Sequence, residues 1–293
     1  MPVAMSNHNA TAEPRDGDII VNGIRLHYLD WGGAGTPIVL LHATGFLGRI
    51  YQPIAQALTA IGHVYSFDQR GHGDSERPRN EIYGWDLTAG DLEGFILAMG
   101  FGQVRGIGHS AGATAIGVVA SGRPDLISRA VLIEPVIFDL NDPVVRLPSE
   151  MRARTLKRKR TFDSVEAMFQ NFVNKPPYNT WRAGILRDYC ERGTFVDANG
   201  KRALKCPPEV EAEIYATARN FDGFGYLLRC TAPLLVLFGE RTDAPGLALA
   251  PRLAADRRRV TVVPGTTHFI PMEEPELTAR IALEFFREEA PSS

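Results

Sequence analysis

The sequence contains few cysteines and no long apolar segment. Its three cysteines, Cys190, Cys206 and Cys230, are an odd number and lack metal-ligand spacing, which indicates reduced thiols rather than a disulfide framework or a zinc site. No apolar run reaches the roughly 18 residues that a membrane-spanning helix needs. Residues 1–16 lack the basic and apolar regions of a secretion signal. We therefore expect a cytoplasmic protein without membrane attachment.

An excess of charge of one sign, internal repeats and low-complexity segments are also missing. The 32 lysines and arginines against 34 aspartates and glutamates give a formal net charge of −2. This near-balance argues against nucleic acid as the main partner. The length of 293 residues suffices for one large domain with a sizeable core. The sequence leaves the oligomeric state open.

Apolar strand patterns alternate with helical patterns over most of the chain. The first is a hairpin over residues 19–31 with a turn at Asn22-Gly23. The alternation predicts an α/β fold, a mostly parallel sheet with helices on both faces. The remaining expected strands lie at 37–42, 63–68, 103–108, 130–134, 233–239 and 259–263, and the expected helices at 50–61, 85–99, 113–120, 247–255 and 276–289.

The alternation stops between residues 138 and 230, where no clear strand pattern occurs. This segment contains helix-prone stretches, among them a basic run at 152–160. Because connections this long without secondary structure are uncommon in compact domains, we predict a helical insertion. The expected organisation is a disordered tail at 1–16, a core formed by 17–137 and 231–293, and a helical cap at 138–230.

The first candidate for chemistry is Ser110 in the pattern Gly108-His-Ser-Ala-Gly112. An apolar strand leads into this G-x-S-x-G pattern and a helix rich in small residues follows it, as in a nucleophile elbow. The sharp turn places the middle residue at a positive φ, and the flanking glycines remove side chains that would clash. Ser110 is thereby held at a helix N-terminus, which favours developing negative charge. We predict that Ser110 is a nucleophile.

A serine nucleophile needs a base and usually an acid behind the base. Of the seven histidines, His268 is the best candidate because it follows the last expected strand, at the sheet edge where active-site groups gather. We predict Asp243, in the loop after the preceding strand, as the acid. Glu134, at the end of another strand, is the alternative acid.

Two backbone N–H groups must stabilise the oxyanion of a tetrahedral intermediate. One is that of Ala111, directly after the nucleophile. The second is expected from the loop His42-Ala-Thr-Gly-Phe46, with Thr44 as the candidate. Nucleophilic catalysis by a serine, a histidine and an acid needs no cofactor and no metal ion, and we expect neither.

With these residues the chain resembles the α/β-hydrolase superfamily over about residues 19–289, in that superfamily's order of nucleophile, acid and histidine. The resemblance implies an eight-stranded, mostly parallel sheet with a helical cap over the site, and structural roles for Asp68, Arg70 and Asp74. The chain departs from the family pattern in two places. Ala43 stands where the family commonly has the glycine of a His-Gly pair. The predicted acid, Asp243, lies one residue farther past the glycine at the end of its strand than is usual in the family. The segments that carry the resemblance are Leu41-His-Ala-Thr-Gly-Phe46, Asp68-Gln-Arg-Gly-His-Gly-Asp-Ser75, Gly108-His-Ser-Ala-Gly112 and Gly265-Thr-Thr-His-Phe-Ile-Pro271.

These features predict a serine hydrolase that cleaves a carboxylic ester or lactone of a small, fairly apolar molecule through an acyl-enzyme. Ser110 in place of aspartate separates the chain from the haloalkane dehalogenases and epoxide hydrolases that it otherwise resembles. Carbon–carbon hydrolases, acyltransferases, perhydrolases and cofactor-free oxygenases share the motifs, and a ligand receptor with slow turnover is a further alternative. The sequence leaves open the bond, the substrate and the role of Cys206.

Two features of the expected cap also have open roles. The basic run at 152–160 either attracts acidic partners or is a solvated helix face, and we favour the solvated face. The aromatic residues of the cap either line an apolar pocket or form the cap's own core, and we expect the core role for most of them. These residues are Phe169, Phe172, Tyr178, Trp181 and Tyr189.

Overall fold

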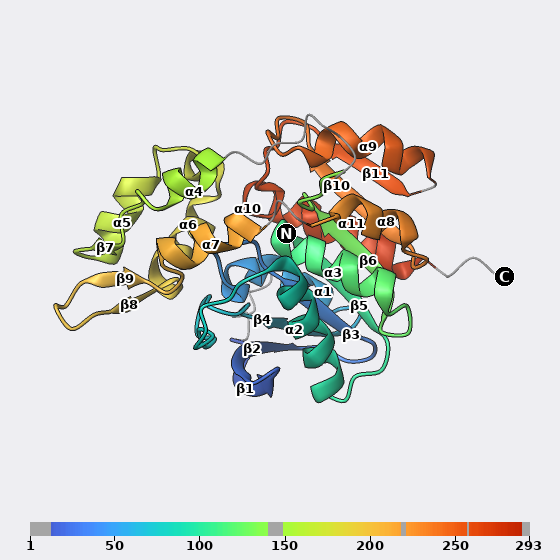
Figure 1. Cartoon of the computed structure of the whole chain (residues 1–293), viewed down its shortest axis with the longest axis horizontal. Coiled ribbons are helices and arrows are strands. Elements are labelled where there is room, and N and C mark those ends of the chain that lie inside the picture. Colours follow the sequence, from blue (N-terminus) through green and yellow to red (C-terminus); the bar gives the residue numbers. More distant parts are fainter. Residues whose placement is uncertain (1–12, 140–148, 218–220, 257, 289–293) are drawn as a thin grey trace, which may run out of the picture.

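The computed structural model describes residues 13–139, 149–217, 221–256 and 258–288. Within these ranges eight strands form the central sheet: β1 (Arg15–Val21), β2 (Ile24–Gly32), β3 (Pro37–Leu41), β4 (His63–Phe67), β5 (Val104–His109), β6 (Ile127–Ile133), β10 (Leu234–Gly239) and β11 (Arg259–Val263). Their order is β1-β2-β4-β3-β5-β6-β10-β11 (Figure 1). The β1–β2 and β2–β4 pairs are antiparallel and the other neighbours are parallel. The predicted α/β fold with a mostly parallel, eight-stranded sheet is confirmed.

The hairpin begins earlier than its apolar pattern indicates. Arg15 pairs with Asp30 in the ladder and forms an ion pair with it at 2.7 Å. An edge strand exposed on one side accepts such polar residues, so β1 includes the end of the tail predicted at 1–16. Positions 1–12 of that tail lie outside the described residues.

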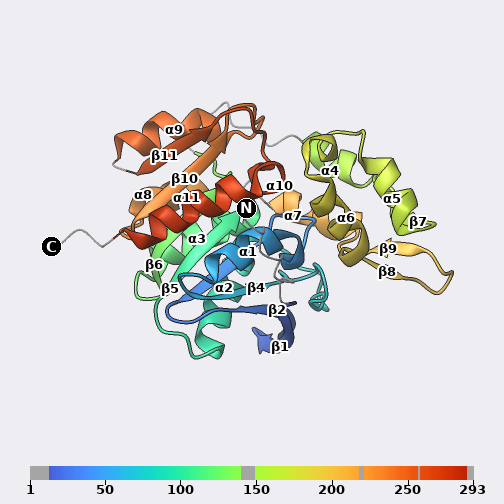
Figure 2. The ribbon, with the colours of Figure 1, turned by 180° about the vertical axis from the view of Figure 1, so that it is seen from behind.

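Helices cover both faces of the sheet because alternating strand residues are buried on both sides. Leu40 and the other strand side chains on its face of the sheet pack against α1 (Gln52–Leu58) and α11 (Pro275–Arg287). Leu41 and the strand side chains that point the same way lie on the opposite face (Figures 1 and 2). On that face lie α2 (Trp85–Ala98), α3 (Ala111–Gly122), α8 (Gly223–Arg229) and α9 (Gly246–Ala255).

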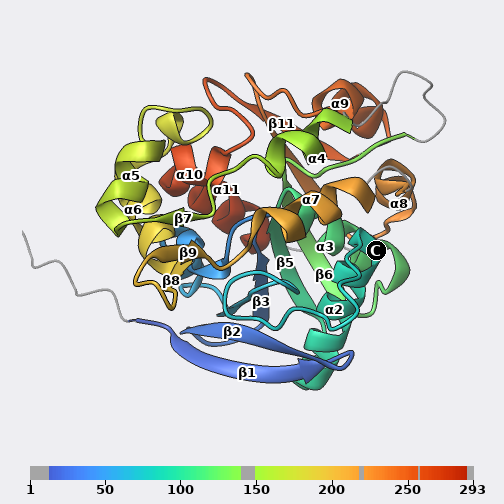
Figure 3. The same cartoon turned by 60° about the vertical axis from the view of Figure 1, so that its left-hand side comes forward.

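The insertion between β6 and β10 forms a cap beside the core. The cap faces the reader in Figure 3. Its helices are α4 (Ser149–Thr155), α5 (Val165–Phe172), α6 (Ala183–Arg192) and α7 (Pro208–Thr217). The cap also contains a three-stranded sheet, which the prediction of a helical insertion missed. Its strands are β7 (Thr161–Phe162), β8 (Thr194–Val196) and β9 (Arg202–Leu204), and segments of two or three residues are too short to show a periodicity.

The end of the insertion belongs to the core by its packing. Helix α8 packs on α3, and Phe224 and Leu227 join the core cluster on that face of the sheet. The cap boundary proposed at residue 230 therefore includes a helix that is packed as part of the core.

The parallel strands end level with one another. Leu41 of β3 lies beside Gly108 of β5, and His109 lies beside Ile133 of β6. Gly239 of β10 lies beside Val263 of β11. The loops after these strands therefore start at one edge of the sheet, which is where ligands bind in open α/β sheets.

Candidate active site

Ser110 occupies the sharp turn between β5 and α3. Its φ is +54°, a strained value for a residue with a Cβ. A Cβ on Gly108 would lie 2.6 Å from the Ala113 nitrogen, and one on Gly112 would lie 2.5 Å from the Leu41 oxygen. Only glycine fits at either position. The strand and helix can therefore pass this closely, and the Ser110 side chain lies at the first turn of α3, with the residue 7% exposed.

His268 is held by Glu134. The His268 Nδ1–H donates to Glu134 Oε2 at 2.9 Å. Glu134 is fully buried, directly follows β6 and has a φ of +50°. Its carboxylate also accepts the Gly239 N–H and, at 2.8 Å, the Thr242 hydroxyl. Because a carboxylate accepts the Nδ1 proton, the Nε2 of His268 keeps a lone pair for a substrate-side proton.

The predicted acid, Asp243, is not the carboxylate that holds His268. Its side chain is exposed, and it has no hydrogen bond or ion pair within the described residues. The turn after β10 is closed by the Thr242 N–H on the Gly239 oxygen at 3.2 Å. This turn points Thr242 inward to Glu134 and leaves the next side chain outside. The extra residue after the strand glycine therefore carries Asp243 away from His268, and the carboxylate that binds His268 is that of the alternative acid, Glu134.

A chain of buried hydrogen bonds passes through His109. It connects the loop at residues 42–46, which we call the oxyanion loop after its predicted role, to the loop that carries His268. The Ala43 N–H donates to the Tyr51 hydroxyl at 3.1 Å, and this hydroxyl donates to His109 Nδ1 at 2.7 Å. The His109 Nε2–H donates to the His268 carbonyl oxygen at 2.8 Å. Burial lowers the pKa of His109 well below its ordinary value, and neighbouring His268 lowers it further, so a neutral imidazole with the proton on Nε2 fits the chain.

Within the described residues Ser110 and His268 do not hydrogen-bond to each other. They lie in one site because His109, the residue before Ser110, binds the His268 backbone, with the two imidazole rings 5.2 Å apart. Bonds between a nucleophile and its base are often long without substrate and tighten in the complex. The spacing of the residues could not have indicated this link, because Tyr51 and His109 are 58 positions apart.

The oxyanion loop leaves one backbone donor free. The Ala43 N–H is bonded to Tyr51, and the Gly45 N–H donates to His72 Nε2 at 2.9 Å. The N–H of Thr44, between them, has no hydrogen-bond partner in the described part of the chain. Ala111 is the first residue of α3, so its N–H also lacks an intrahelical partner. Both N–H groups expected for the oxyanion therefore have no hydrogen-bond partner in the described part of the chain.

The loop after β4 supports the oxyanion loop. Burial lowers the pKa of His72 to about 3, so its neutral ring accepts the Gly45 N–H. Arg70 and Asp91 form a buried, bidentate pair with both distances at 2.7 Å, which fixes the loop to α2. Asp68 accepts the Gly48 N–H at 2.8 Å. The contacts of Arg70 and Asp68 are those of residues that hold a loop in place.

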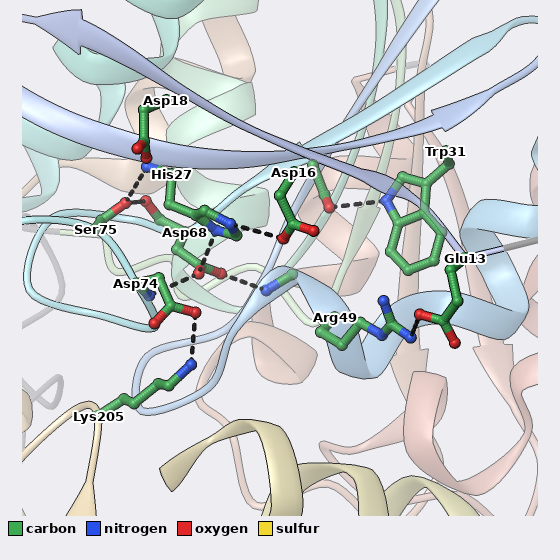
Figure 4. Close-up of polar contacts among 12 residues, drawn as sticks. Glu13, Asp16, Asp18, His27, Trp31, Arg49, Asp68, Asp74, Ser75 and Lys205 are labelled. Atoms are coloured by element: carbon green, nitrogen blue, oxygen red, sulfur yellow. Dashed lines mark hydrogen bonds and ion pairs between the residues drawn. The ribbon is translucent and has the colours of Figure 1, made fainter. Parts of the chain in front are cut away.

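Asp68 also belongs to an ion-pair network with His27 and Asp74 (Figure 4). These three side chains are close enough to resemble a metal site. Burial lowers the pKa of His27, but hydrogen bonds and charge from Asp68 and Asp16 outweigh it and raise that pKa to about 9. A protonated imidazole must lose its proton before it can ligate a metal. Asp74 in turn pairs with Lys205 of the cap at 2.5 Å, so the network joins the hairpin, the loop and the cap.

Cap residues contact both loops of the site. The Trp181 ring lies 5.1 Å from that of Phe46 in the oxyanion loop and 5.5 Å from that of Phe269, which follows His268. Tyr189 donates to the Gly45 oxygen at 3.4 Å. Cys206 is buried in a cluster with Ala111, and burial raises the pKa of its thiol, which disfavours the thiolate.

Half of the basic run of the cap is paired within the cap. Three of its six basic residues form ion pairs with glutamates of α7. This pairing reduces the net charge that the run offers to an acidic partner. The pairs are Arg152–Glu213, Arg158–Glu211 and Arg160–Glu209.

A sequence profile described as the Alpha/beta hydrolase family matches residues 38–281. The chain belongs to the alpha/beta hydrolase family. The matched segment starts in β3, ends in α11 and includes Ser110, Glu134 and His268. No helix in the described ranges is long and apolar enough to span a membrane.

Relatives of this alpha/beta hydrolase are themselves hydrolases. The chain is 26% identical over 258 residues to the 2-(acetamidomethylene)succinate hydrolase of Mesorhizobium japonicum, which covers 86% of this chain and 88% of that protein. It is 35% identical over 122 residues to the N-formylmaleamate deformylase of Pseudomonas putida, covering 41% of this chain and 45% of that protein. A crystal structure of E-2-(acetamidomethylene)succinate hydrolase matches the fold with a TM-score of 0.83 at 24% identity, covering 94% of this chain and all of that one. Family and relatives together support hydrolase activity.

Proposed function

We propose that this chain is a serine hydrolase that cleaves a carboxylic ester or lactone of a small molecule. The observation that supports it most is the hydrogen bond from His268 Nδ1 to the buried Glu134 carboxylate, at the sheet edge where Ser110 sits in a strained turn. A base oriented by a buried acid beside a serine at a helix N-terminus is the arrangement that activates a hydroxyl.

In the proposed mechanism His268 Nε2 takes the Ser110 proton as Oγ attacks the substrate carbonyl. Glu134 holds the imidazole in the required tautomer and stabilises the imidazolium that forms. The free N–H groups of Thr44 and Ala111 stabilise the oxyanion. His268 then gives its proton to the alcohol oxygen as the ester bond breaks. The acyl group stays bound to Ser110 as an acyl-enzyme. Water activated by the same histidine releases the acid.

Labelling with a fluorophosphonate, beside a panel of p-nitrophenyl esters and lactones, tests this function. We expect the label on wild-type protein, no label on Ser110→Ala, and turnover that depends on acyl length. Absence of label on folded wild-type protein would contradict an activated Ser110. Labelling without turnover of any ester or lactone would shift the reaction to carbon–carbon cleavage, acyl transfer, perhydrolysis or slow turnover by a receptor.

Hydrolysis of an N-acyl bond is a second candidate, favoured by the names of two relatives. One acts on an acetamidomethylene succinate and the other removes a formyl group from a maleamate. The proposed Ser110 chemistry serves an amide as well as an ester, since only the leaving group changes. Product analysis separates the two: an alcohol released with the acid indicates an ester, and ammonia or an amine indicates an amide.

A further inference from the structure

The cap contains a buried hydrogen-bond donor without a partner. The indole N–H of Trp181 makes no hydrogen bond within the described residues, and the residue is 7% exposed. The other two tryptophans of the sequence are satisfied: Trp31 donates to Ser66 Oγ at 2.9 Å and Trp85 to the Ile214 oxygen at 3.0 Å. Buried donors are nearly always paired because an unpaired one destabilises the fold. The exception at Trp181 indicates an acceptor from outside the chain.

Trp181 lies between the two loops that carry the proposed chemistry. Its ring contacts Phe46, two residues after Thr44, and Phe269, directly after His268. A molecule with its carbonyl at the Thr44 N–H would lie beside the loop that Trp181 contacts. The unpaired donor is therefore carried by a ring that contacts both loops of the proposed site.

The polar groups around Trp181 are already paired. Arg158 forms an ion pair with Glu211 and donates to the Tyr178 hydroxyl at 2.9 Å. The Tyr189 hydroxyl reaches the Gly45 oxygen. The Tyr178 and Tyr189 rings lie 5.1 and 6.2 Å from the Trp181 ring. In this part of the described cap the guanidinium charge is balanced, and the indole N–H is the donor left over.

We propose that Trp181 Nε1–H recognises a second acceptor oxygen on the acyl chain of the substrate, a keto or carboxylate oxygen separate from the carbonyl that Ser110 attacks. This inference rests on the proposed function and replaces the fairly apolar substrate with an oxygen-bearing one. A hydrocarbon chain leaves the indole N–H unpaired in the complex. A site built around a buried donor discriminates against the analogue that lacks the partner.

Three p-nitrophenyl esters with the same leaving group test the proposal: pentanoate, levulinate and hemisuccinate. Levulinate differs from pentanoate by a keto oxygen, and hemisuccinate carries a carboxylate. We expect wild-type kcat/KM for levulinate or hemisuccinate to exceed that for pentanoate by about tenfold or more. The preferred ester of the two identifies the oxygen as keto or carboxylate.

Trp181→Phe keeps an aromatic ring and removes the donor together with the pyrrole half of the indole. We expect it to reduce the preference for the oxygen-bearing ester about tenfold, through KM, and to lower Tm less than Trp31→Phe, which loses the same ring volume and also a paired donor. The matched control is Trp31→Phe, which removes a paired indole N–H in β2. It should lower Tm and keep the wild-type preference.

An unchanged preference in Trp181→Phe, or no preference in the wild type, would overturn this inference alone. A drop in Tm like that of Trp31→Phe would also overturn it, because it would mean that the indole N–H has a structural partner. The fluorophosphonate could label Ser110 while the protein hydrolyses none of the three esters. In that case the same comparison is made by measuring how well free levulinate, succinate and pentanoate each protect Ser110 from the label. Folded wild-type protein that does not label would remove the proposed function and this inference with it.

Discussion

Two residues of the site are held in backbone conformations that L-residues avoid. Ser110 and Glu134 have φ values of +54° and +50°, and each directly follows a parallel strand. Such strain costs about 1–3 kcal/mol and persists where the surroundings over-determine it. Here the strand ladder and the close pass of α3 fix Ser110, and three hydrogen bonds fix Glu134. The strain turns both side chains toward the sheet edge rather than along their strands.

The contact of His109 with the His268 backbone gives it the role of positioning His268. Replacement of His109 tests this role. His109→Met removes the donor to the His268 oxygen, whereas His109→Gln keeps an amide donor there. We expect the rate of fluorophosphonate labelling to fall about a hundredfold in the methionine variant, because a displacement of about 1 Å has effects of that size. The glutamine variant should recover most of the rate.

The downfield NMR signal of the His268 Nδ1 proton gives a readout that a merely structural role would not move. It should weaken in His109→Met and persist in His109→Gln. Equal labelling rates in both variants and the wild type, with the fold intact by circular dichroism, would rule out the positioning role.

At the scale of elements, local patterns were predictable and turn directions were not. Glycine spacing and apolar runs identified the elbow at Gly108–Gly112 and the strands around it, because both signals are local. The spacing favours Asp243 over Glu134, but the turn after β10 decides whether Thr242 or Asp243 points inward, and spacing alone does not fix a turn. The strands β7, β8 and β9 were missed because they are stabilised by pairing rather than by pattern.

The contact between α3 and β3 gives a test at this scale. Gly112→Ala puts a Cβ 2.5 Å from the Leu41 oxygen and 2.6 Å from the His42 oxygen. Backbone atoms cannot move aside cheaply, so we expect a loss of about 1–3 kcal/mol in the free energy of unfolding and slower labelling of Ser110. Thermal and urea unfolding measure the loss.

The control for this change is Gly122→Ala at the end of the same helix. A Cβ there meets nothing within 4 Å, so the variant should be neutral or stabilised by up to about 1 kcal/mol. Equal stability of Gly112→Ala and the wild type would show that α3 can shift away from β3 without cost.

At the scale of the whole molecule, one charged network joins the hairpin, the loop after β4 and the cap. His27 bridges Asp68 and Asp16, and Asp74 reaches Lys205 of the cap (Figure 4). These contacts link parts of the chain that no local pattern connects. The cap is also joined to both site loops by the Trp181 contacts, so its position depends on segments that are far apart in the sequence.

The raised pKa of His27 predicts a pH dependence of stability. Its value of about 9 in the folded protein exceeds the ordinary 6.5, so the folded state binds the proton more tightly. The stabilisation is complete below about pH 6.5 and is lost as the pH rises through 9, with a size on the order of 2 kcal/mol. Unfolding of wild type and His27→Gln at a series of pH values should show curves that converge above pH 9. Curves that stay parallel would contradict this.

The most direct test of the central claim compares the two carboxylates by the rate at which a fluorophosphonate labels Ser110. If His268 is oriented by Glu134, Glu134→Gln should slow labelling by about three to four orders of magnitude, because the amide favours the wrong tautomer. Asp243→Asn should stay within about twofold of the wild type, since exposed changes of this kind have small effects. A larger loss in Asp243→Asn than in Glu134→Gln would contradict the account of this site.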